Sequence, residues 1–312
     1  RRSGRTGFGR PSLSAGTALK RKKAAFTPMD GVVGVLFLGA VGTIVYRIQA
    51  GLHYDWNWEA IPQYLLRYDE ASGEWVPNML LQGLFTTIRL SFWGVLLATL
   101  IGGVMGLCRV SRRLFFRLIG GAYVGLTRNL PPLVLIFIFY FFVSNQIMPL
   151  LRVDDLLADS PEGVRDVLTF LFARPAAFST FLSALMTLAV FEGAYIAEIV
   201  RAGIQSIDRG QWEASAALGL NRWQQLRRVI LPQAVRRILP PLAGQFISTI
   251  KDSAIVSVIS IQELTFQGLE LMAATYLTFE IWITIAALYL LLSLTLSLGV
   301  DRLEIRLRRS EA

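Results

Sequence analysis

Six long apolar segments constrain the fold of this chain more than any other feature. They cover residues 30–48, 83–107, 117–143, 177–201, 236–260 and 279–300. A helix needs about 20 apolar residues to cross the hydrocarbon core of a bilayer, because each residue adds about 1.5 Å. Charged residues make up only 17% of the chain, below the roughly 25% of an ordinary soluble domain. The sequence therefore predicts an all-α membrane protein with six transmembrane helices.

The distribution of charge predicts how these helices are oriented. Of the 31 basic residues, 23 lie in four segments: 1–30, 108–117, 201–237 and 301–312. The other three connections hold four basic residues and 13 of the 22 acidic ones: 49–80, 144–178 and 261–280. Loops rich in Lys and Arg remain on the cytoplasmic side. We therefore expect both termini in the cytoplasm, and we attribute the net charge of +9 to topology rather than to nucleic-acid binding.

Cysteine and histidine are too scarce for several classes of site. The single cysteine, Cys108, excludes a disulfide framework, and the single histidine, His53, leaves no Cys/His set for a metal or haem. The chain also lacks the G-x-x-x-x-G-K-[ST] loop that binds ATP. The basic start followed by an apolar run resembles a signal peptide, but no small-x-small cleavage pattern closes it. We interpret the run as a retained first helix.

Two backbone features bear on how the helices pack. Pro131 and Pro132 lie inside the third segment, where they remove two backbone donors and interrupt the helix. Such a break fits either a kinked packing helix or a helix bent around a translocation path. Glycines spaced by four residues, which let helices approach closely in membranes, form two pairs: Gly102 with Gly106 and Gly121 with Gly125.

Ionisable side chains inside the apolar segments are the candidates for a substrate site: Arg89, Arg128, Glu192, Glu198, Lys251 and Asp252. Each costs roughly 2.5–3.5 kcal/mol at the centre of a membrane helix, so each should face the bundle interior or a wet cavity. Arg128 with Glu192 or Glu198 could bind the carboxylate and ammonium groups of an amino-acid zwitterion. Alternatively, Arg128–Glu192 and Lys251–Glu198 could be structural salt bridges, with Asp252 neutralising Lys251.

The stretch between the fourth and fifth segments is long, basic and helix-prone, and Gly219 interrupts it. On pattern alone it could dock a soluble partner or lie on the lipid headgroups. Seven of its residues match the spacing E-A-A-x3-G-x9-I-x-L-P: Glu213, Ala214, Ser215, Gly219, Val229, Leu231 and Pro232. This pattern resembles the EAA loop of permease subunits in bacterial binding-protein-dependent ABC importers. Ser215 and Val229 depart from it conservatively, as Ala and Ile are usual there.

The resemblance extends beyond this loop, over about residues 80–305. Segments 128–133, 192–204 and 251–255 are similar to the polar-amino-acid branch of the same family. The resemblance implies a five-helix permease core in the bacterial inner membrane that moves polar amino acids from periplasm to cytoplasm. It also implies that Glu213, Ala214, Ser215, Gly219, Leu231 and Pro232 couple the core to the ATPase.

The resemblance further implies the partners of such a subunit. Separate ATPase subunits would bind ATP and Mg²⁺, so this chain would be non-catalytic and hold no cofactor or metal itself. A second permease, identical or paralogous, would complete the pathway, and a periplasmic amino-acid-binding protein would deliver the substrate. Arg128, Glu192, Arg89, Glu198 and Lys251 are the candidate substrate residues of the core, but the identity of the amino acid remains open.

The expected organisation has four parts. They are a basic cytoplasmic tail (1–29), an extra N-terminal helix with a periplasmic loop (30–79), the permease domain (80–305, with its coupling loop at 206–232) and a cytoplasmic tail (306–312). The alternatives are a stand-alone secondary transporter or channel, or a structural subunit of another membrane complex. Inverted-repeat transporters have two similar halves, which residues 80–200 and 201–305 are not.

Overall fold

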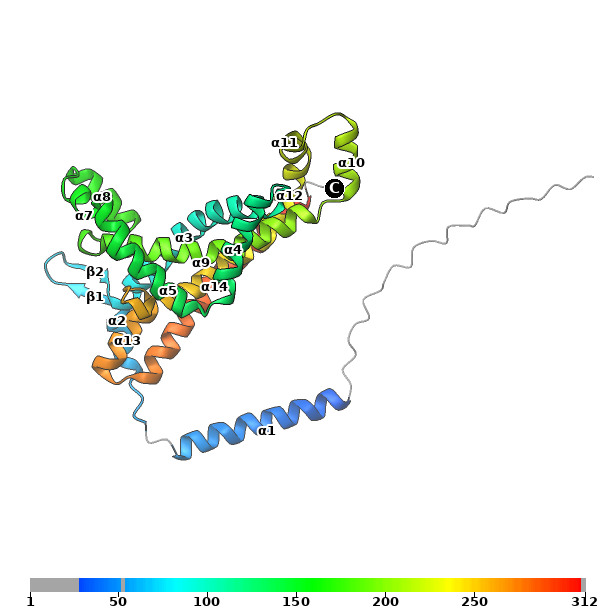
Figure 1. The fold of residues 1–312 in the computed structure, drawn as a ribbon. Helices are drawn as coiled ribbons and strands as arrows, with labels where there is room; N and C mark the ends of the chain where they lie inside the picture. The colour runs from blue at the N-terminus through cyan, green and yellow to red at the C-terminus, as the bar shows by residue number, and fades with distance from the viewer. Residues whose placement is uncertain (1–27, 52–53, 310–312) are drawn as a thin grey trace, which may run out of the picture. The chain divides into compact units, whose positions relative to one another are not determined.

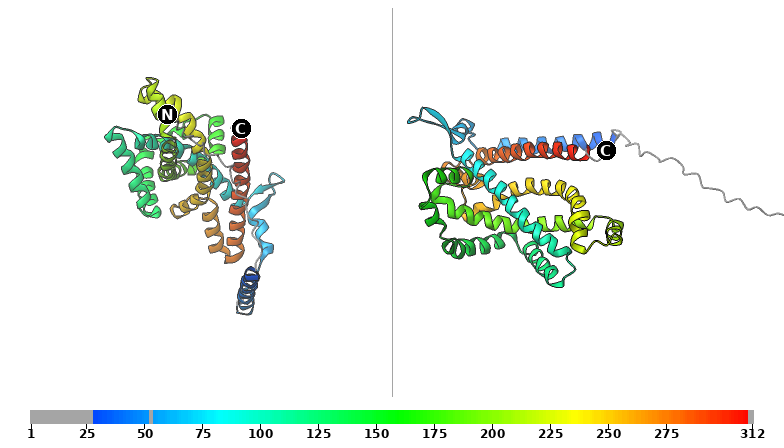
Figure 2. Two further views of the ribbon diagram at one scale, coloured as in Figure 1. Left: turned by 90° about the vertical axis from the view of Figure 1, so that its right-hand side faces the viewer. Right: turned by 90° about the horizontal axis from the view of Figure 1, so that it is seen from above.

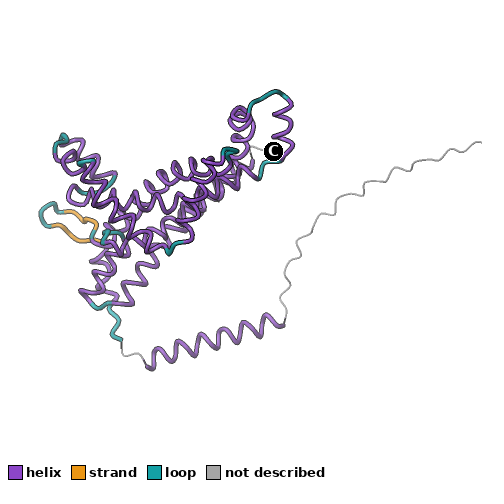
Figure 3. Tube along the Cα trace, viewed as in Figure 1, coloured by secondary structure: helices purple, strands orange, loops and turns teal. Residues whose placement is uncertain are grey.

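The computed structural model describes residues 28–51 and 54–309, and these are almost entirely helical (Figure 3). The chain divides into two compact units, with the boundary between Asp55 and Trp56. The first unit contributes one described element, helix α1 (Pro28–Gly51), whose side chains are largely exposed. The predicted tail at 1–29 lies almost wholly outside the described residues, as does His53. The predicted tail at 306–312 begins inside helix α14 (Thr278–Arg309).

Five helical stretches in the described residues are long and apolar enough to cross a membrane: Met79–Val110, Pro132–Leu150, Pro175–Gln205, Arg222–Ile259 and Thr278–Val300. Four of them coincide with the predicted segments that begin at residues 83, 177, 236 and 279. In the described part of the first unit, Pro28–Thr43 forms a shorter apolar helix. The protein is therefore a mostly helical membrane protein with five long apolar helices and one shorter one at the start.

The predicted third segment is divided by its prolines. Helix α4 (Leu114–Asn129) ends just before them, and helix α5 (Pro132–Phe142) begins with Pro132 in its first turn. Leu130 is extended, with a ψ of 148°, because a residue before proline is sterically excluded from the helical region. Asn129 donates through Nδ2 to the Gly125 carbonyl at 2.8 Å, which satisfies one carbonyl at the open end of α4.

Helices α3 (Met79–Val110) and α9 (Phe178–Gln205) form the centre of the second unit. They pack at backbone distance: a Cβ atom at Gly102 would lie 2.7 Å from the Gly193 carbonyl oxygen, and one at Gly106 would lie 2.7 Å from Val200 Cβ. The prediction for this glycine pair is confirmed. At Gly121 and Gly125 an added Cβ would meet nothing within 4 Å among the described residues, so this pair makes no close helix contact within them.

The two ends of the second unit differ in construction (Figures 1 and 2). One end carries helices α10 (Arg209–Ala217) and α11 (Arg222–Gln224). The opposite end carries helix α2 (Ile61–Leu65), the hairpin of strands β1 (Leu66–Asp69) and β2 (Glu74–Pro77), and helices α7 (Val153–Ala158), α8 (Glu162–Leu171) and α13 (Leu264–Thr275). The first end holds the segment with the EAA-type spacing.

A buried carboxylate joins three helices near the hairpin end. Glu263 caps α13 by accepting from the backbone N–H groups of Thr265 and Phe266 at 2.9 and 2.8 Å. It also accepts from the Tyr289 hydroxyl of α14 at 2.9 Å and from the Thr87 hydroxyl of α3 at 3.3 Å. Burial raises the pKa of Glu263, and these hydrogen bonds oppose that rise. The carboxylate therefore fixes α13 between α3 and α14.

Candidate functional site

The segment with the EAA-type spacing forms two short helices and a turn at one end of the molecule (Figure 1). Asp208 caps α10 by accepting from the Gly210 N–H, and Asn221 and Gln224 form a reciprocal capping box at α11. Glu213 and Ala214 are exposed on α10, whereas Ser215 is buried and donates to the Trp212 carbonyl at 2.9 Å. Glu213 and Ala214 therefore lie on the solvent-exposed side of α10.

Gly219 terminates α10 by adopting a left-handed conformation. Its φ is +76°, and the Leu220 N–H reaches back to the Ser215 carbonyl at 3.2 Å. An added Cβ would meet nothing within 4 Å among the described residues. Within this chain the left-handed backbone conformation, and not a close contact, is therefore the reason that favours glycine here.

Polar contacts hold the two short helices against the long ones. The Arg222 guanidinium stacks on the Trp212 ring, with its carbon 3.6 Å from the ring centroid. Gln233 donates through Nε2 to Gln211 Oε1 at 3.1 Å, and Arg237 donates to the Ser206 carbonyl. These contacts join α10 to α11 and to helix α12 (Leu231–Asp252). Movement of this segment is thereby linked to movement of α9 and α12.

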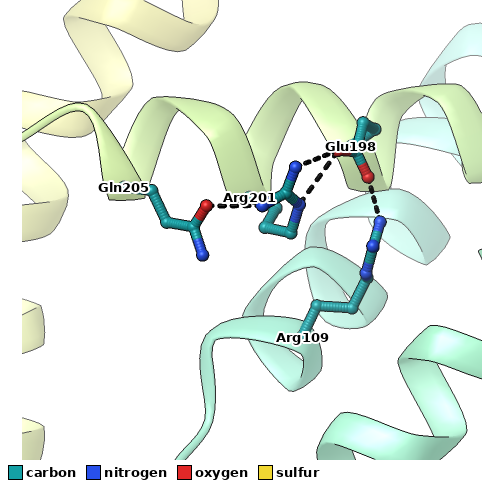
Figure 4. Close-up of polar contacts among 4 residues, drawn as sticks. All are labelled: Arg109, Glu198, Arg201 and Gln205. Carbon is teal, nitrogen blue, oxygen red and sulfur yellow. Dashed lines mark hydrogen bonds and ion pairs between the residues drawn. The ribbon is translucent and has the colours of Figure 1, made fainter.

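A charged cluster ties α9 to α3 close to this segment (Figure 4). Glu198 on α9 pairs with Arg109 on α3 through one oxygen and with Arg201 on α9 through the other. Arg201 also donates to Gln205. The three charged side chains are 22–29% exposed, so they are partly shielded from water. The cluster therefore serves helix–helix attachment.

A cavity of about 450 Å³ lies where the break between α4 and α5 meets α9 and α12. Eight residues line it: Pro132, Phe191, Tyr195, Gln245, Ser248, Lys251, Asp252 and Ile255. Its polar lining contains one cation, one carboxylate, an amide and two hydroxyls. This chemistry suits a small zwitterion that also carries a polar side chain.

Glu192 lies behind this cavity, midway along α9. It is fully buried, and its Oε2 accepts from Gln245 Nε2 at 2.7 Å. Its other oxygen, Oε1, has no hydrogen-bond partner among the described residues, although Asp252 lies close enough to interact with the carboxyl group. Since Gln245 lines the cavity, Glu192 acts on the cavity through the orientation of that amide.

Comparison with known proteins identifies the family. Residues 94–309 match the family described as binding-protein-dependent transport system inner membrane component. That match covers more than half of the chain. The chain belongs to this family. It is therefore the permease component of an ABC importer, a non-catalytic multi-pass protein of the inner membrane, and the ATPase of such a system is a separate subunit.

Two proteins similar to the permease are described as permeases of glutamine transporters. The glutamine transport system permease protein GlnP of Escherichia coli K12 is 45% identical over 150 residues, which are 46% of this chain and 68% of that protein. The probable glutamine ABC transporter permease protein GlnM of Bacillus subtilis 168 is 31% identical over 233 residues, or 75% of this chain and 95% of that protein.

Solved structures agree on the fold. The crystal structure of an amino acid ABC transporter with histidines is 33% identical, with a TM-score of 0.59, and the match covers 73% of the permease and 94% of that chain. An inward-facing structure of the MetNI methionine ABC transporter has a TM-score of 0.55 at 19% identity and covers 96% of that chain. The second likeness shows the fold alone.

The predicted substrate residues of the permease separate into two groups. Lys251 lines the cavity, Glu192 touches it through Gln245, and Arg128 stacks over the ring of Tyr195 at 5.2 Å. Arg89 and Glu198 have other partners. Arg89 donates to the Thr169 and Phe172 carbonyls near the end of α8. Glu198 belongs to the cluster with Arg109.

Neither predicted salt bridge, Arg128–Glu192 or Lys251–Glu198, forms in the described part of the permease. Helix rotation explains this, because Glu198 faces Arg109 of α3 and Glu192 faces Gln245 of α12. Sequence reasoning missed Tyr195, Gln245 and Ser248. Gln245, Ser248 and Asp252 are spaced i, i+3, i+7 along α12. A search for a polar helical face around Asp252 would therefore have found Gln245 and Ser248.

Proposed function

We propose that this permease carries glutamine, or a closely similar polar amino acid, through the cavity at the α4–α5 break. The cavity supports this proposal, because the lining combines Lys251 and Asp252 with the amide of Gln245 and the hydroxyl of Ser248. Relatives described as glutamine permeases give the substrate class. The polar lining of the cavity is the observation on which the proposal rests.

In this proposal different lining residues bind different groups of the amino-acid zwitterion. Lys251 attracts the α-carboxylate, and Asp252 attracts the α-ammonium group. Gln245 can donate to and accept from a side-chain amide, since an amide has both functions. Glu192 holds Gln245 in one orientation through the 2.7 Å hydrogen bond, which fixes which end of the amide faces the substrate.

We further propose that the chain crosses the membrane six times, with both termini in the cytoplasm. The boundaries are a tail at 1–29, the extra helix and loop at 30–79, the permease domain at 80–305 and a tail at 306–312. The charge asymmetry of the loops supports this topology. The hairpin end then faces the periplasm, and α10 faces the cytoplasm.

The coupling loop at 206–232 docks on the ATPase in this proposal. The exposed residues of α10 and its turn, which include Glu213, Ala214 and Gly219, form the contact. Ser215, which is buried, and Leu231, which is half-buried, support it from within, and Pro232 is exposed in the first turn of α12. A second permease, identical or paralogous, completes the pathway, and a periplasmic amino-acid-binding protein delivers the substrate.

Uptake of labelled glutamine into proteoliposomes that contain the whole complex tests the substrate. We expect uptake to require ATP inside the liposomes and to be competed by unlabelled glutamine before other amino acids. Lys251→Gln should lower uptake at least tenfold and leave basal ATP hydrolysis intact, whereas Ser160→Ala, at the hairpin end, should change neither. Uptake without ATP would instead favour a stand-alone transporter, and preference for an apolar amino acid would contradict the proposed site.

A further inference from the structure

The hairpin of β1 and β2 has an apolar face that is exposed among the described residues, and an opposite face with three charged residues. Tyr68 pairs with Trp75, and Leu66 pairs with Pro77 in the antiparallel register. Directly paired residues lie on the same face of a hairpin, and alternate residues share a face, so these four side chains form one surface. Leu66, Tyr68 and Trp75 are 41%, 55% and 68% exposed, and the two rings meet edge to face at 5.6 Å. Arg67, Asp69, Glu74 and Val76 occupy the other face.

The hairpin is held firmly despite its size. An isolated two-stranded hairpin is marginally stable in water, so the attachment must come from the rest of the unit. Ile61 of α2 is buried in a cluster with Leu80, Leu264 and Ile281. The Asn57 N–H donates to Glu280 Oε1 at 2.8 Å, and the Asn78 N–H donates to the Leu65 carbonyl at 2.8 Å. The exposed aromatic face is therefore presented in a fixed orientation.

The surroundings of this face are acidic. Between residues 56 and 77 this unit has four acidic residues and one basic residue, Arg67. At the same end of the unit (Figure 1), helices α7 and α8 add Asp154, Asp155, Glu162 and Asp166, against Arg165 and against Arg152, which pairs with Asp155. Trp and Tyr also occur at lipid headgroups, but carboxylates are repelled by anionic lipid, which instead attracts Lys and Arg. An aromatic patch with an acidic rim fits a protein partner that has a basic rim.

We infer that the aromatic face of the hairpin, Leu66, Tyr68, Trp75 and Pro77, is a docking surface for the substrate-loaded binding protein of this importer. The inference rests on the proposed topology, which puts the hairpin in the periplasm. The hairpin lies outside residues 94–309, which the family match covers. It would increase the affinity of this permease for its own binding protein.

Two measurements on the complete complex test the inference. In the first, a photoreactive benzoylphenylalanine replaces Trp75, and the complex in lipid nanodiscs is irradiated with its glutamine-loaded binding protein. We expect a cross-linked product with the combined mass of permease and binding protein. In the second, Tyr68→Ser with Trp75→Ser should raise the concentration of binding protein that gives half-maximal ATP hydrolysis about tenfold or more. Basal hydrolysis should not change.

The control is Arg67→Ser, on the opposite face of the same hairpin, which should leave the half-maximal concentration within about twofold. Adducts with lipid alone, or an unchanged half-maximal concentration in the double variant, would overturn the docking surface. Topology is checked separately with Trp75→Cys in a Cys108→Ser background. Labelling by a membrane-impermeant maleimide added outside the cell supports the periplasmic location, and protection from it contradicts both the topology and this inference.

Discussion

Single residues decide whether the proposed coupling loop keeps its shape, and Gly219 is the clearest case. Its φ of +76° lies in the left-handed region, where a residue with a Cβ costs about 1–2 kcal/mol and a β-branched residue more. Asn tolerates this region better than other residues. Space is not limiting, because an added Cβ would meet nothing within 4 Å.

We therefore expect Gly219→Val to reduce substrate-stimulated ATP hydrolysis and transport together, by about tenfold, while the protein still inserts. Gly219→Asn should retain most of both activities. ATP hydrolysis by the reconstituted complex, with and without loaded binding protein, measures the difference. If Gly219→Asn were as inactive as Gly219→Val, the glycine would be needed for a close contact with the ATPase and not for its conformation.

Glu192 gives a second prediction for a single residue. Glu192→Gln keeps an oxygen that can accept from Gln245, so the packing of α9 against α12 should survive. The new amide can also donate, so it no longer fixes which end of the Gln245 amide faces the cavity. We expect membrane abundance close to that of the unchanged protein, basal ATP hydrolysis intact and uptake lost. Uptake and abundance are measured on the same membranes. Since Arg128 stacks on Tyr195, the added change Arg128→Gln should not restore uptake. Loss of the protein from the membrane would assign Glu192 a structural role alone.

At the scale of elements, the cluster around Glu198 attaches α9 to α3. Glu198→Gln leaves two partly shielded guanidinium groups with a weaker partner, and a lost partner of this kind costs about 1–3 kcal/mol. We expect a lower temperature of thermal unfolding in detergent. The exposed pair Arg152–Asp155 is the matched control, since its side chains are 78% and 66% exposed. Asp155→Asn should change stability by less than about 0.5 kcal/mol. Equal effects of the two changes would contradict the assigned role.

The elements differ in how far the sequence alone could predict them. The long helices could be predicted because hydrophobic length is a local property, and the turn at Gly219 after α10 follows the equally local E-A-A-x3-G spacing. The break at Pro131 could be predicted for the same reason. The partner of Glu198 could not, because Arg109 lies 89 residues away and its approach depends on how α3 and α9 are rotated about their axes. The cavity forms only where the α4–α5 break, α9 and α12 come together. The sequence could therefore suggest its charged residues but not the rest of its lining.

At the scale of the whole molecule, the alternation of charge predicts which end faces which compartment. A reporter fused after residue 160 should be active in the periplasm, and one fused after residue 208 should be active in the cytoplasm. The first position lies between α7 and α8 and the second at the start of α10, which are opposite ends of the second unit (Figure 1). Fusions that report the same side would contradict the six-helix topology.

The close packing of α9 against α3 has a mechanical consequence. Because α3 has no side chain at Gly102 and Gly106, Ile196 and Val200 of α9 pack directly against its backbone, and little space is left for the two helices to slide past each other. Helix α9 runs without interruption from Phe178 to Gln205, three residues before the cap of α10. A displacement of α10 is therefore transmitted along one continuous helix. Glu192 lies about 20 Å from Gln205 along this helix, at 1.5 Å per residue. We therefore expect the chain to bend at Leu130, the extended residue between α4 and α5, when α9 is displaced.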